Sequence, residues 1–217
     1  MDATWKHPFT CVVAGPTSCG KTTFVLKLVQ DAPYLIDPPP QNILWIYDHY
    51  QDVYSTLEDR VTFSTDLEDL DQLPKERRHL VVVDDKMGMA GTKMADLFTK
   101  GSHHRNISVV YIVQNLFDQT KEHRGISLNA HYMVVFKNPR EKTQISVLAR
   151  QARPGTGGLV LRAFEQATAR PHGYLFFDFR QETPEEIRIR TNVLPSEPGP
   201  HRVFAIVPRE EEKELEV

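Results

Sequence analysis

Short apolar runs separated by polar or amphipathic stretches form the main pattern of the chain. Five of these runs have the length of a β-strand: Thr10–Ala14, 43–47, 80–83, 109–113 and Tyr132–Phe136. The run at 80–83 is Leu-Val-Val-Val, the composition of a strand that is covered on both faces. Strands that alternate with helical segments are typical of βαβ units. The pattern therefore predicts an α/β fold with a mostly parallel central sheet flanked by helices.

Two of the intervening segments have helical periodicity. In 21–30, Phe24, Val25, Leu28 and Val29 lie on one helical face. In 141–150, the corresponding face carries Ile145, Leu148 and Ala149. Loops are predicted at Pro33 and at the three consecutive prolines 38–40, because proline interrupts regular backbone structure.

The C-terminal third contains two further strand-like runs, 174–179 and 187–191, which predict a hairpin at one edge of the sheet. The composition then changes. Segment 195–217 contains four prolines and ends in a run rich in glutamate. We therefore expect one folded domain over 1–194 and a Pro-rich, acidic C-terminal arm or tail over 195–217.

The connection between the first strand and the first helix matches the motif G-x-x-x-x-G-K-[ST]. Its residues are Gly15, Pro16, Thr17, Ser18, Cys19, Gly20, Lys21 and Thr22, followed by Thr23. Glycines let such a loop turn tightly, so that backbone N–H groups surround a phosphate at the N-terminus of the helix. The motif predicts an ATP site in which Lys21 reaches the β- and γ-phosphates and the Thr22 hydroxyl binds Mg²⁺.

Polar residues follow two other predicted strands. Asp84 and Asp85 come directly after 80–83, and Gln114 comes directly after 109–113. Asp84 is the expected second ligand of Mg²⁺, a cation that prefers oxygen donors. Asp85 is the candidate for orienting or deprotonating an attacking water. Gln114 is a candidate γ-phosphate sensor, provided that its strand lies between the P-loop strand and the Asp84 strand.

Composition and charge exclude several classes of protein. The chain has 217 residues, with 26 Lys and Arg against 29 Asp and Glu, a net charge of −3. This balance argues against a globally basic nucleic-acid binder. Two cysteines are too few for a disulfide scaffold. No apolar run approaches the roughly 18–20 residues of a membrane-spanning helix, and no secretory signal precedes Pro8, so we expect a protein that is not secreted.

The nucleotide motif alone leaves several functions open. A signalling GTPase is disfavoured because the chain has no N-K-x-D motif. A nucleoside or nucleotide kinase remains an alternative, as does a scaffold that binds ATP without turnover. The adjacent carboxylates Asp84 and Asp85 favour activation of water, and hence hydrolysis.

Three segments resemble one known family. Segment 101–108 (GSHHRNIS), running into 109–115, resembles the FtsK–HerA superfamily of P-loop NTPases and especially its viral branch, the poxvirus-type DNA-packaging ATPases. Segments 136–151 and 173–178 resemble the same branch. The resemblance covers roughly residues 8–194. It implies an ASCE-type strand arrangement and an ATPase ring that drives double-stranded DNA into a capsid, in contact with a capsid or portal-vertex protein. It also implies a location at sites of virion assembly in the infected cell, in cytoplasm or nucleus.

The resemblance also assigns roles to two arginines. Arg105 matches the position of an arginine finger, which enters the site of the neighbouring subunit and neutralises developing charge. Arg140 is the second candidate for this role. One residue departs from the family pattern: Asp85 stands where the superfamily commonly has glutamate, and its side chain is one methylene shorter.

Three basic stretches are candidates for contacting the phosphates of DNA. The first, 137–153, contains Lys137, Arg140, Lys142, Arg150 and Arg153 against one glutamate, and is followed by an expected loop at 154–158. The others are 121–124 and an expected loop at 86–93 after the acidic pair. A solvated surface is the competing interpretation of all three, because exposed basic residues are common.

Overall fold

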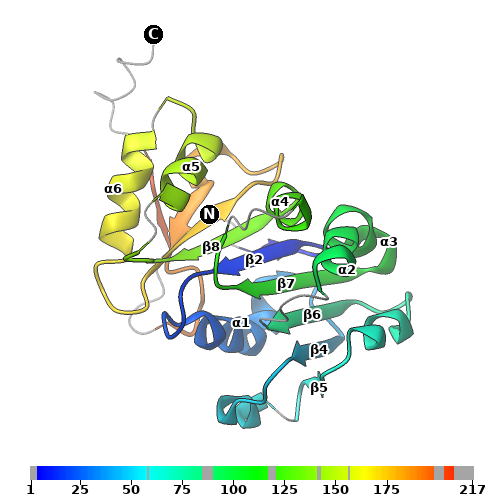
Figure 1. Ribbon diagram of the computed structural model, residues 1–217. Helices are drawn as coiled ribbons and strands as arrows, with labels where there is room; N and C mark the ends of the chain where they lie inside the picture. The colour runs from blue at the N-terminus through cyan, green and yellow to red at the C-terminus, as the bar shows by residue number, and fades with distance from the viewer. Residues whose placement is uncertain are drawn as a thin grey trace.

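The computed structural model describes residues 4–57, 59–84, 90–116, 121–140, 143–155, 157–197 and 203–207. Within these residues nine strands form one sheet, in the order β11-β10-β9-β8-β2-β7-β6-β4-β5 (Figure 1). They are β2 (Thr10–Ala14), β4 (Asn42–Tyr47), β5 (Thr62–Ser64), β6 (His79–Asp84), β7 (Ile107–Val113), β8 (Tyr132–Phe136), β9 (Tyr174–Asp178), β10 (Ile189–Thr191) and β11 (Phe204–Ala205). The short strands β1 (Trp5–Lys6) and β3 (Ile36–Asp37) pair separately.

The six strands from β8 to β5 are parallel to one another. Strand β7 lies between β2, which precedes the phosphate loop, and β6, which ends at Asp84. This is the ASCE-type order, and it fulfils the condition on which the position of Gln114 depended. The predicted α/β fold with a mostly parallel sheet is confirmed.

The predicted edge hairpin is present as β9 and β10, which pair antiparallel. Its strands are shorter than predicted. Strand β9 ends before Phe179, and Ile187 is the last residue of the 3₁₀ helix η4 (Glu185–Ile187) instead of the first residue of β10. Strand β11, from the segment predicted as a tail, pairs with β10 and forms the edge of the sheet. A short part of segment 195–217 thus belongs to the sheet.

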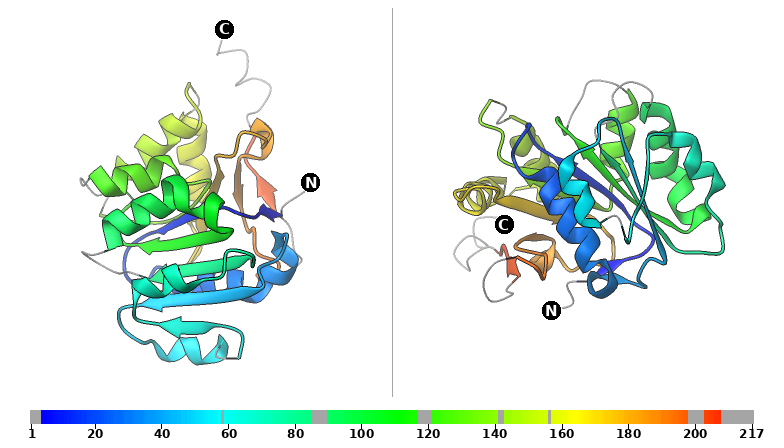
Figure 2. Two further views of the ribbon diagram at one scale, coloured as in Figure 1. Left: turned by 90° about the vertical axis from the view of Figure 1, so that its right-hand side faces the viewer. Right: turned by 90° about the horizontal axis from the view of Figure 1, so that it is seen from below.

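Helices cover both faces of the sheet, as Figures 1 and 2 show. Helix α1 (Lys21–Leu35) and the 3₁₀ helix η1 (Asp52–Leu57) pack on one face. The opposite face carries a larger set: the 3₁₀ helix η2 (Leu67–Gln72), α2 (Ala90–Asp96), the π-helix η3 (Leu97–Gly101), α3 (Ser102–Arg105), α4 (Lys121–Leu128), α5 (Thr143–Ala152) and α6 (Gly157–Ala167).

Side chains along the central strands point alternately to the two faces of the sheet, and they contribute to a hydrophobic core on each face. In β2, Val12 and Ala14 pack with the α5 and α6 layer, whereas Cys11 and Val13 pack with α1. All four side chains are at most 3% exposed. Successive side chains of a strand point to opposite faces, so a strand covered on both sides must be apolar throughout. This rigid centre fixes the ends of β2, β6 and β7, where the polar residues lie.

Three loop predictions were wrong. Helix α1 continues through Pro33, whose ring is exposed in the last turns, where its fixed φ is compatible with a helix and only one hydrogen bond is lost. Helix α6 begins at Gly157, inside the segment expected to be a loop, because Val160, Ala163 and Phe164 form a buried face. Helix α2 likewise includes residues 90–93. The remainder of that expected loop, 86–89, lies outside the described residues.

None of the helices that the structure describes is long and apolar enough to cross a bilayer.

Candidate nucleotide site

The phosphate-loop motif occupies the turn between β2 and α1. Strand β2 ends at Ala14, and α1 begins at Lys21 with Gly20 as its N-cap. Gly20 has φ 109° and Ser18 has φ 63°, so the backbone turns twice through the left-handed region before it enters the helix. Such turns direct successive N–H groups toward one point, in line with the helix dipole. The local geometry is that of an anion-binding loop.

Both motif glycines are required by their surroundings. A Cβ atom on Gly15 would lie 2.7 Å from the Cys19 Sγ and 2.7 Å from the Phe136 Cβ. A Cβ atom on Gly20 would lie 3.0 Å from Nδ1 of His172, in a conformation that side chains rarely adopt. Burial raises the pKa of the Cys19 thiol above its ordinary value despite the nearby charge of Lys21. Cys19 is therefore a packing residue of the loop, protonated at neutral pH.

The ammonium group of Lys21 lies inside the loop. Its Nζ donates hydrogen bonds to the carbonyl oxygens of Gly15, at 2.6 Å, and Pro16, at 2.9 Å. The residue is only 9% exposed. Its positive charge is thereby held against the first residues of the loop, beside the cavity that the loop lines.

A cavity of about 450 Å³ opens along this loop at the carboxyl ends of β2, β6 and β7. Eight of the predicted residues line it: Thr17, Ser18, Gly20, Lys21, Thr22, Thr23, Asp84 and Gln114. Gln51 and His172, which the sequence did not single out, line it as well. The structure thus brings together residues from five separate segments of the chain.

Asp84 ends β6 and is 6% exposed. Its Oδ2 accepts a hydrogen bond of 2.8 Å from the hydroxyl of Tyr54, a buried residue of η1. Burial, followed by the negative charge of Asp84, raises the pKa of Tyr54 far above its ordinary value. The phenol therefore remains a donor over the whole neutral range and orients the carboxylate.

The residues predicted to bind Mg²⁺ are suited to that cation. The Thr22 hydroxyl and the Asp84 carboxylate line one cavity and offer oxygen atoms, the donors that Mg²⁺ prefers. The carboxylate is buried, and the Tyr54 hydrogen bond fixes its rotation. Ligand orientation by such an outer hydrogen bond is typical of metal sites.

Gln114 follows β7 directly and lines the cavity beside Asp84. The loop that it begins is tied to α5, because the backbone N–H of Leu116 donates to Oε1 of Gln144 at 3.3 Å. Asp85, the candidate base, lies outside the described residues.

Arg105 lies at the amino ends of the parallel strands, whereas the phosphate loop lies at their carboxyl ends. It ends α3, just before the amino end of β7, and its Nη1 donates to Oδ1 of Asp71 at 2.6 Å. The seven residues of β7 separate it from Gln114, roughly 20 Å at the rise of a β-strand. Arg105 therefore lies far from the phosphate loop of its own chain.

Arg140 lies at the carboxyl end of the parallel strands, as the phosphate loop does, in the turn that follows β8. Its side chain is exposed, and its backbone N–H donates to Oδ1 of Asn138 at 3.1 Å. The preceding residues Lys137, Asn138 and Pro139 form part of the wall of a second cavity.

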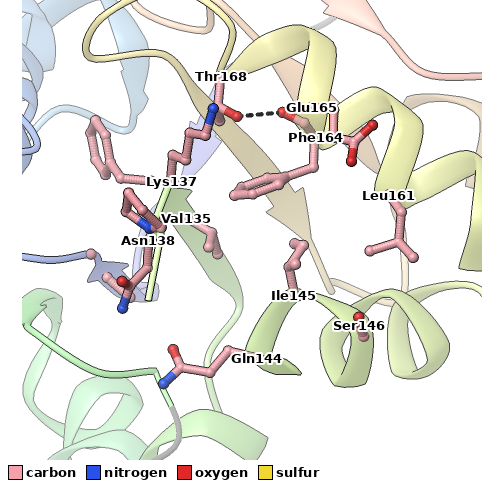
Figure 3. A pocket seen from close by; sticks show the side chains of 14 residues that line it. Val135, Lys137, Asn138, Gln144, Ile145, Ser146, Leu161, Phe164, Glu165 and Thr168 are labelled. Atoms are coloured by element: carbon pink, nitrogen blue, oxygen red, sulfur yellow. Dashed lines mark hydrogen bonds between the residues drawn. The ribbon is translucent and has the colours of Figure 1, made fainter. Parts of the chain in front are cut away.

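This second cavity, about 440 Å³ in volume, lies between the ends of β2 and β8 and the helices α5 and α6. Figure 3 shows apolar side chains from both helices, among them Ile145, Leu161 and Phe164, in its walls. Gly15 lines this cavity, whereas Thr17, Ser18 and Gly20 of the same loop line the first one.

The sequence did not indicate three residues that line or support the cavity along the phosphate loop. Gln51 and Tyr54 lie in a segment without helical or strand periodicity, and His172 lies in a turn between α6 and β9. Only the sheet order brings these segments to the phosphate loop. The one available signal was the aromatic spacing of Tyr47, Tyr50 and Tyr54, whose rings are in contact.

No model of a known protein family and no curated protein matches the chain. Among solved structures, it is similar to the genome packaging NTPase B204 of Sulfolobus turreted icosahedral virus 2, solved in complex with ATP-γ-S, with a TM-score of 0.55 and 14% identity over 84% of this chain and 96% of that one.

Two structures of EssC align less closely. The cytoplasmic domain of EssC aligns with a TM-score of 0.45 and 14% identity, over 62% of this chain and 32% of that one. ATPases 2 and 3 of EssC from Geobacillus thermodenitrificans align with a TM-score of 0.42 and 13% identity, over 58% of this chain and 32% of that one. At 14% identity the likeness to the packaging NTPase shows the fold alone.

Proposed function

We propose that this protein hydrolyses ATP and uses the energy to package viral double-stranded DNA into capsids. The observation that carries the proposal is the cavity in which Lys21, Thr22, Asp84 and Gln114 meet. These residue types are what phosphoryl transfer requires: a cation for the β- and γ-phosphates, two oxygen ligands for Mg²⁺ and an amide near the terminal phosphate. The fold neighbour, a genome packaging NTPase with a bound ATP analogue, supports the same reading.

In the proposed reaction each residue has a distinct task. The loop N–H groups and Lys21 bind and orient the triphosphate. Thr22 and Asp84 would hold Mg²⁺, which when bound neutralises charge on the phosphate oxygens. Gln114 orients the attacking water, and Asp85 accepts its proton. Tyr54 acts on this chemistry only through Asp84, which makes it a positioning residue.

The position of Arg105 favours an assembly of several subunits. At roughly 20 Å from its own cavity, along β7, it is too distant to act within one chain. Its guanidinium lies on the surface, 38% exposed and paired with Asp71. We infer that it acts as an arginine finger in the neighbouring subunit of a homo-oligomeric ring, with Arg140 as the second candidate. The ring would contact a capsid or portal-vertex protein at sites of virion assembly in the cytoplasm or nucleus of the infected cell.

The DNA-binding surface is expected on exposed basic residues. Lys137, Arg140 and Arg150 are exposed, as is Arg124 on α4. The nearby Lys142 lies outside the described residues. Contacts with phosphates release counterions, so binding should weaken as the salt concentration rises.

The test is phosphate release by the purified protein with ATP and Mg²⁺, in the presence and absence of duplex DNA. Lys21→Ala should abolish release. Lys27→Ala, on the same helix but outside the cavity, should not. Normal hydrolysis by Lys21→Ala would refute the assignment of this cavity as the site of ATP hydrolysis.

The same assay separates the alternative functions. Phosphate transfer to an added nucleoside, without dependence on assembly or DNA, would identify a nucleoside or nucleotide kinase. Tight ATP binding without turnover, even with DNA present, would identify an assembly scaffold. Electron microscopy with a non-hydrolysable ATP analogue and duplex DNA tests the motor directly, since a translocase should form a closed ring around DNA.

A further inference from the structure

His172 forms part of the nucleotide cavity, although it comes from the turn between α6 and β9. Its Nδ1 lies 3.0 Å from the carbonyl oxygen of Cys19 in the phosphate loop. A carbonyl oxygen only accepts hydrogen bonds, so Nδ1 carries a proton in this contact. The ring is thereby anchored to the loop at one edge, while the residue as a whole is exposed.

The order of the strands shows which end of the cavity His172 occupies. Asp84 ends β6 and Gln114 follows β7, and both strands lie on one side of the phosphate-loop strand β2. His172 precedes β9, two strands from β2 on the other side, roughly 10 Å away at the usual strand spacing. If Asp84 and Gln114 face the terminal phosphate, a nucleoside triphosphate bound along the loop directs its nucleoside toward His172.

We propose that His172 binds the nucleoside part of the substrate, with its imidazole face stacked on the base. This inference rests on the proposed ATPase function. An aromatic ring offers a flat π-surface to any base, and the hydrogen bond to Cys19 holds that ring in place before the nucleotide arrives. Preorganisation of this kind reduces the entropy lost on binding.

The turn that carries His172 is supported by other contacts. The next residue, Gly173, has no room for a side chain, since a Cβ atom there would lie 2.1 Å from the carbonyl oxygen of Ala167. Its N–H donates to the backbone carbonyl oxygen of Arg170 at 3.1 Å, and Nη2 of Arg170 donates to Oδ1 of Asn192 at 3.1 Å. The turn is therefore expected to persist when the imidazole is removed.

The experiment compares the binding of ATP with that of inorganic tripolyphosphate, which has no nucleoside, by calorimetry in the presence of Mg²⁺. The main variant is His172→Asn. His172 has φ 60°, a conformation that asparagine adopts more readily than most residues, so this change removes the ring with little backbone strain. His172→Phe keeps a ring face, and Gln166→Ala, on the exposed side of α6, is the surface control.

We expect His172→Asn to weaken ATP binding about tenfold, the effect of losing one stacked base. The same variant should bind tripolyphosphate as the wild type does, and His172→Phe should recover most of the ATP affinity. Equal weakening for both ligands would overturn the proposal, because it would mean that His172 only supports the loop through Cys19. Unchanged ATP affinity would also overturn it. Wild-type protein that binds neither ligand would instead refute the ATP site itself.

Discussion

The hydroxyl of Tyr54 donates a hydrogen bond of 2.8 Å to Oδ2 of Asp84. Tyr54 is fully buried, and its ring packs against Trp45 and Phe63, so the donor has a fixed position. Asp84 is the carboxylate proposed to bind Mg²⁺. The aromatic cluster beside β4 thus controls the orientation of a residue at the end of β6.

The change Tyr54→Phe removes this donor and keeps the ring. We expect the free energy of unfolding to fall by about 1–2 kcal/mol, because a buried carboxylate oxygen loses a partner. The Mg²⁺ concentration for half-maximal ATP hydrolysis should rise about tenfold, as is typical when an outer hydrogen bond to a metal ligand is lost. Tyr50→Phe, in the same cluster but 48% exposed, is the control. A Mg²⁺ dependence identical to that of the wild type would contradict the positioning role.

The contact between Tyr54 and Asp84 also predicts how the stability of the protein changes at alkaline pH. Burial and the charge of Asp84 raise the pKa of Tyr54, so at pH above about 10 the unfolded chain loses a proton that the folded chain keeps. Stability should therefore fall as pH rises through this range, by up to about 1.4 kcal/mol per pH unit from this group. Urea unfolding at pH 9 and pH 11 measures the effect. In Tyr54→Phe the decrease should be smaller; an equal decrease would exclude Tyr54 as its source.

Two glycine substitutions should have opposite effects. Gly20→Ala places a side chain at φ 109° and 3.0 Å from the ring of His172, so we expect a loss of at least about 1–2 kcal/mol in stability and a loss of ATP affinity. Gly125→Ala, within α4, meets open space and should stabilise the protein by about 0.5–1 kcal/mol. Thermal unfolding compares the two. A stable Gly20→Ala protein that binds ATP normally would disprove the assigned loop geometry.

The core of the fold could be predicted because its signal is local. The apolar runs of β2, β6 and β7 require burial on both faces, and the loop motif identifies which of them precedes the phosphate site. Helix α6 was missed because Gly157 and Gly158 suggested a loop, although Val160, Ala163 and Phe164 have helical spacing. At that point packing against the sheet overrides weak local propensity.

The position of a candidate site residue was predictable only where the glycine motif or a strand end supplies that residue. Lys21 belongs to the glycine motif, and Asp84 and Gln114 directly follow apolar runs, so their positions follow from the parallel sheet. Tyr54 and His172 reach the site through the sheet order, and their partners Asp84 and Cys19 are 30 and 153 residues away along the chain. No local pattern encodes contacts of that separation.

Gln114→Ala should separate catalysis from binding. If Gln114 orients the attacking water, kcat should fall by about 10²-fold or more while the Kd for ATP changes little. Single-turnover hydrolysis and equilibrium binding measure the two quantities separately. Gln51→Ala is an informative comparison, since Gln51 lines the same cavity from another segment. A parallel loss of affinity in Gln114→Ala would assign this residue to ground-state binding instead.

Arg105→Ala should abolish turnover while leaving ATP binding intact, because the proposed finger acts on the transition state of a neighbouring subunit. The expected loss in kcat is about 10³-fold or more. Asp71→Asn should retain activity, since it removes a surface carboxylate that Arg105 and Lys93 share in their own chain, and exposed ion pairs contribute less than about 1 kcal/mol each.

Mixing variants tests whether Arg105 acts in trans. A ring of Arg105→Ala and Lys21→Ala subunits contains sites in which an intact Lys21 faces an intact Arg105 of the neighbour, so activity should be partly restored. The control mixture of Gln114→Ala and Lys21→Ala should stay inactive, because both residues line the cavity of one chain. Restoration by Arg140→Ala in place of Arg105→Ala would assign the finger to Arg140. No restoration at any ratio of Arg105→Ala to Lys21→Ala would exclude Arg105 from the shared site.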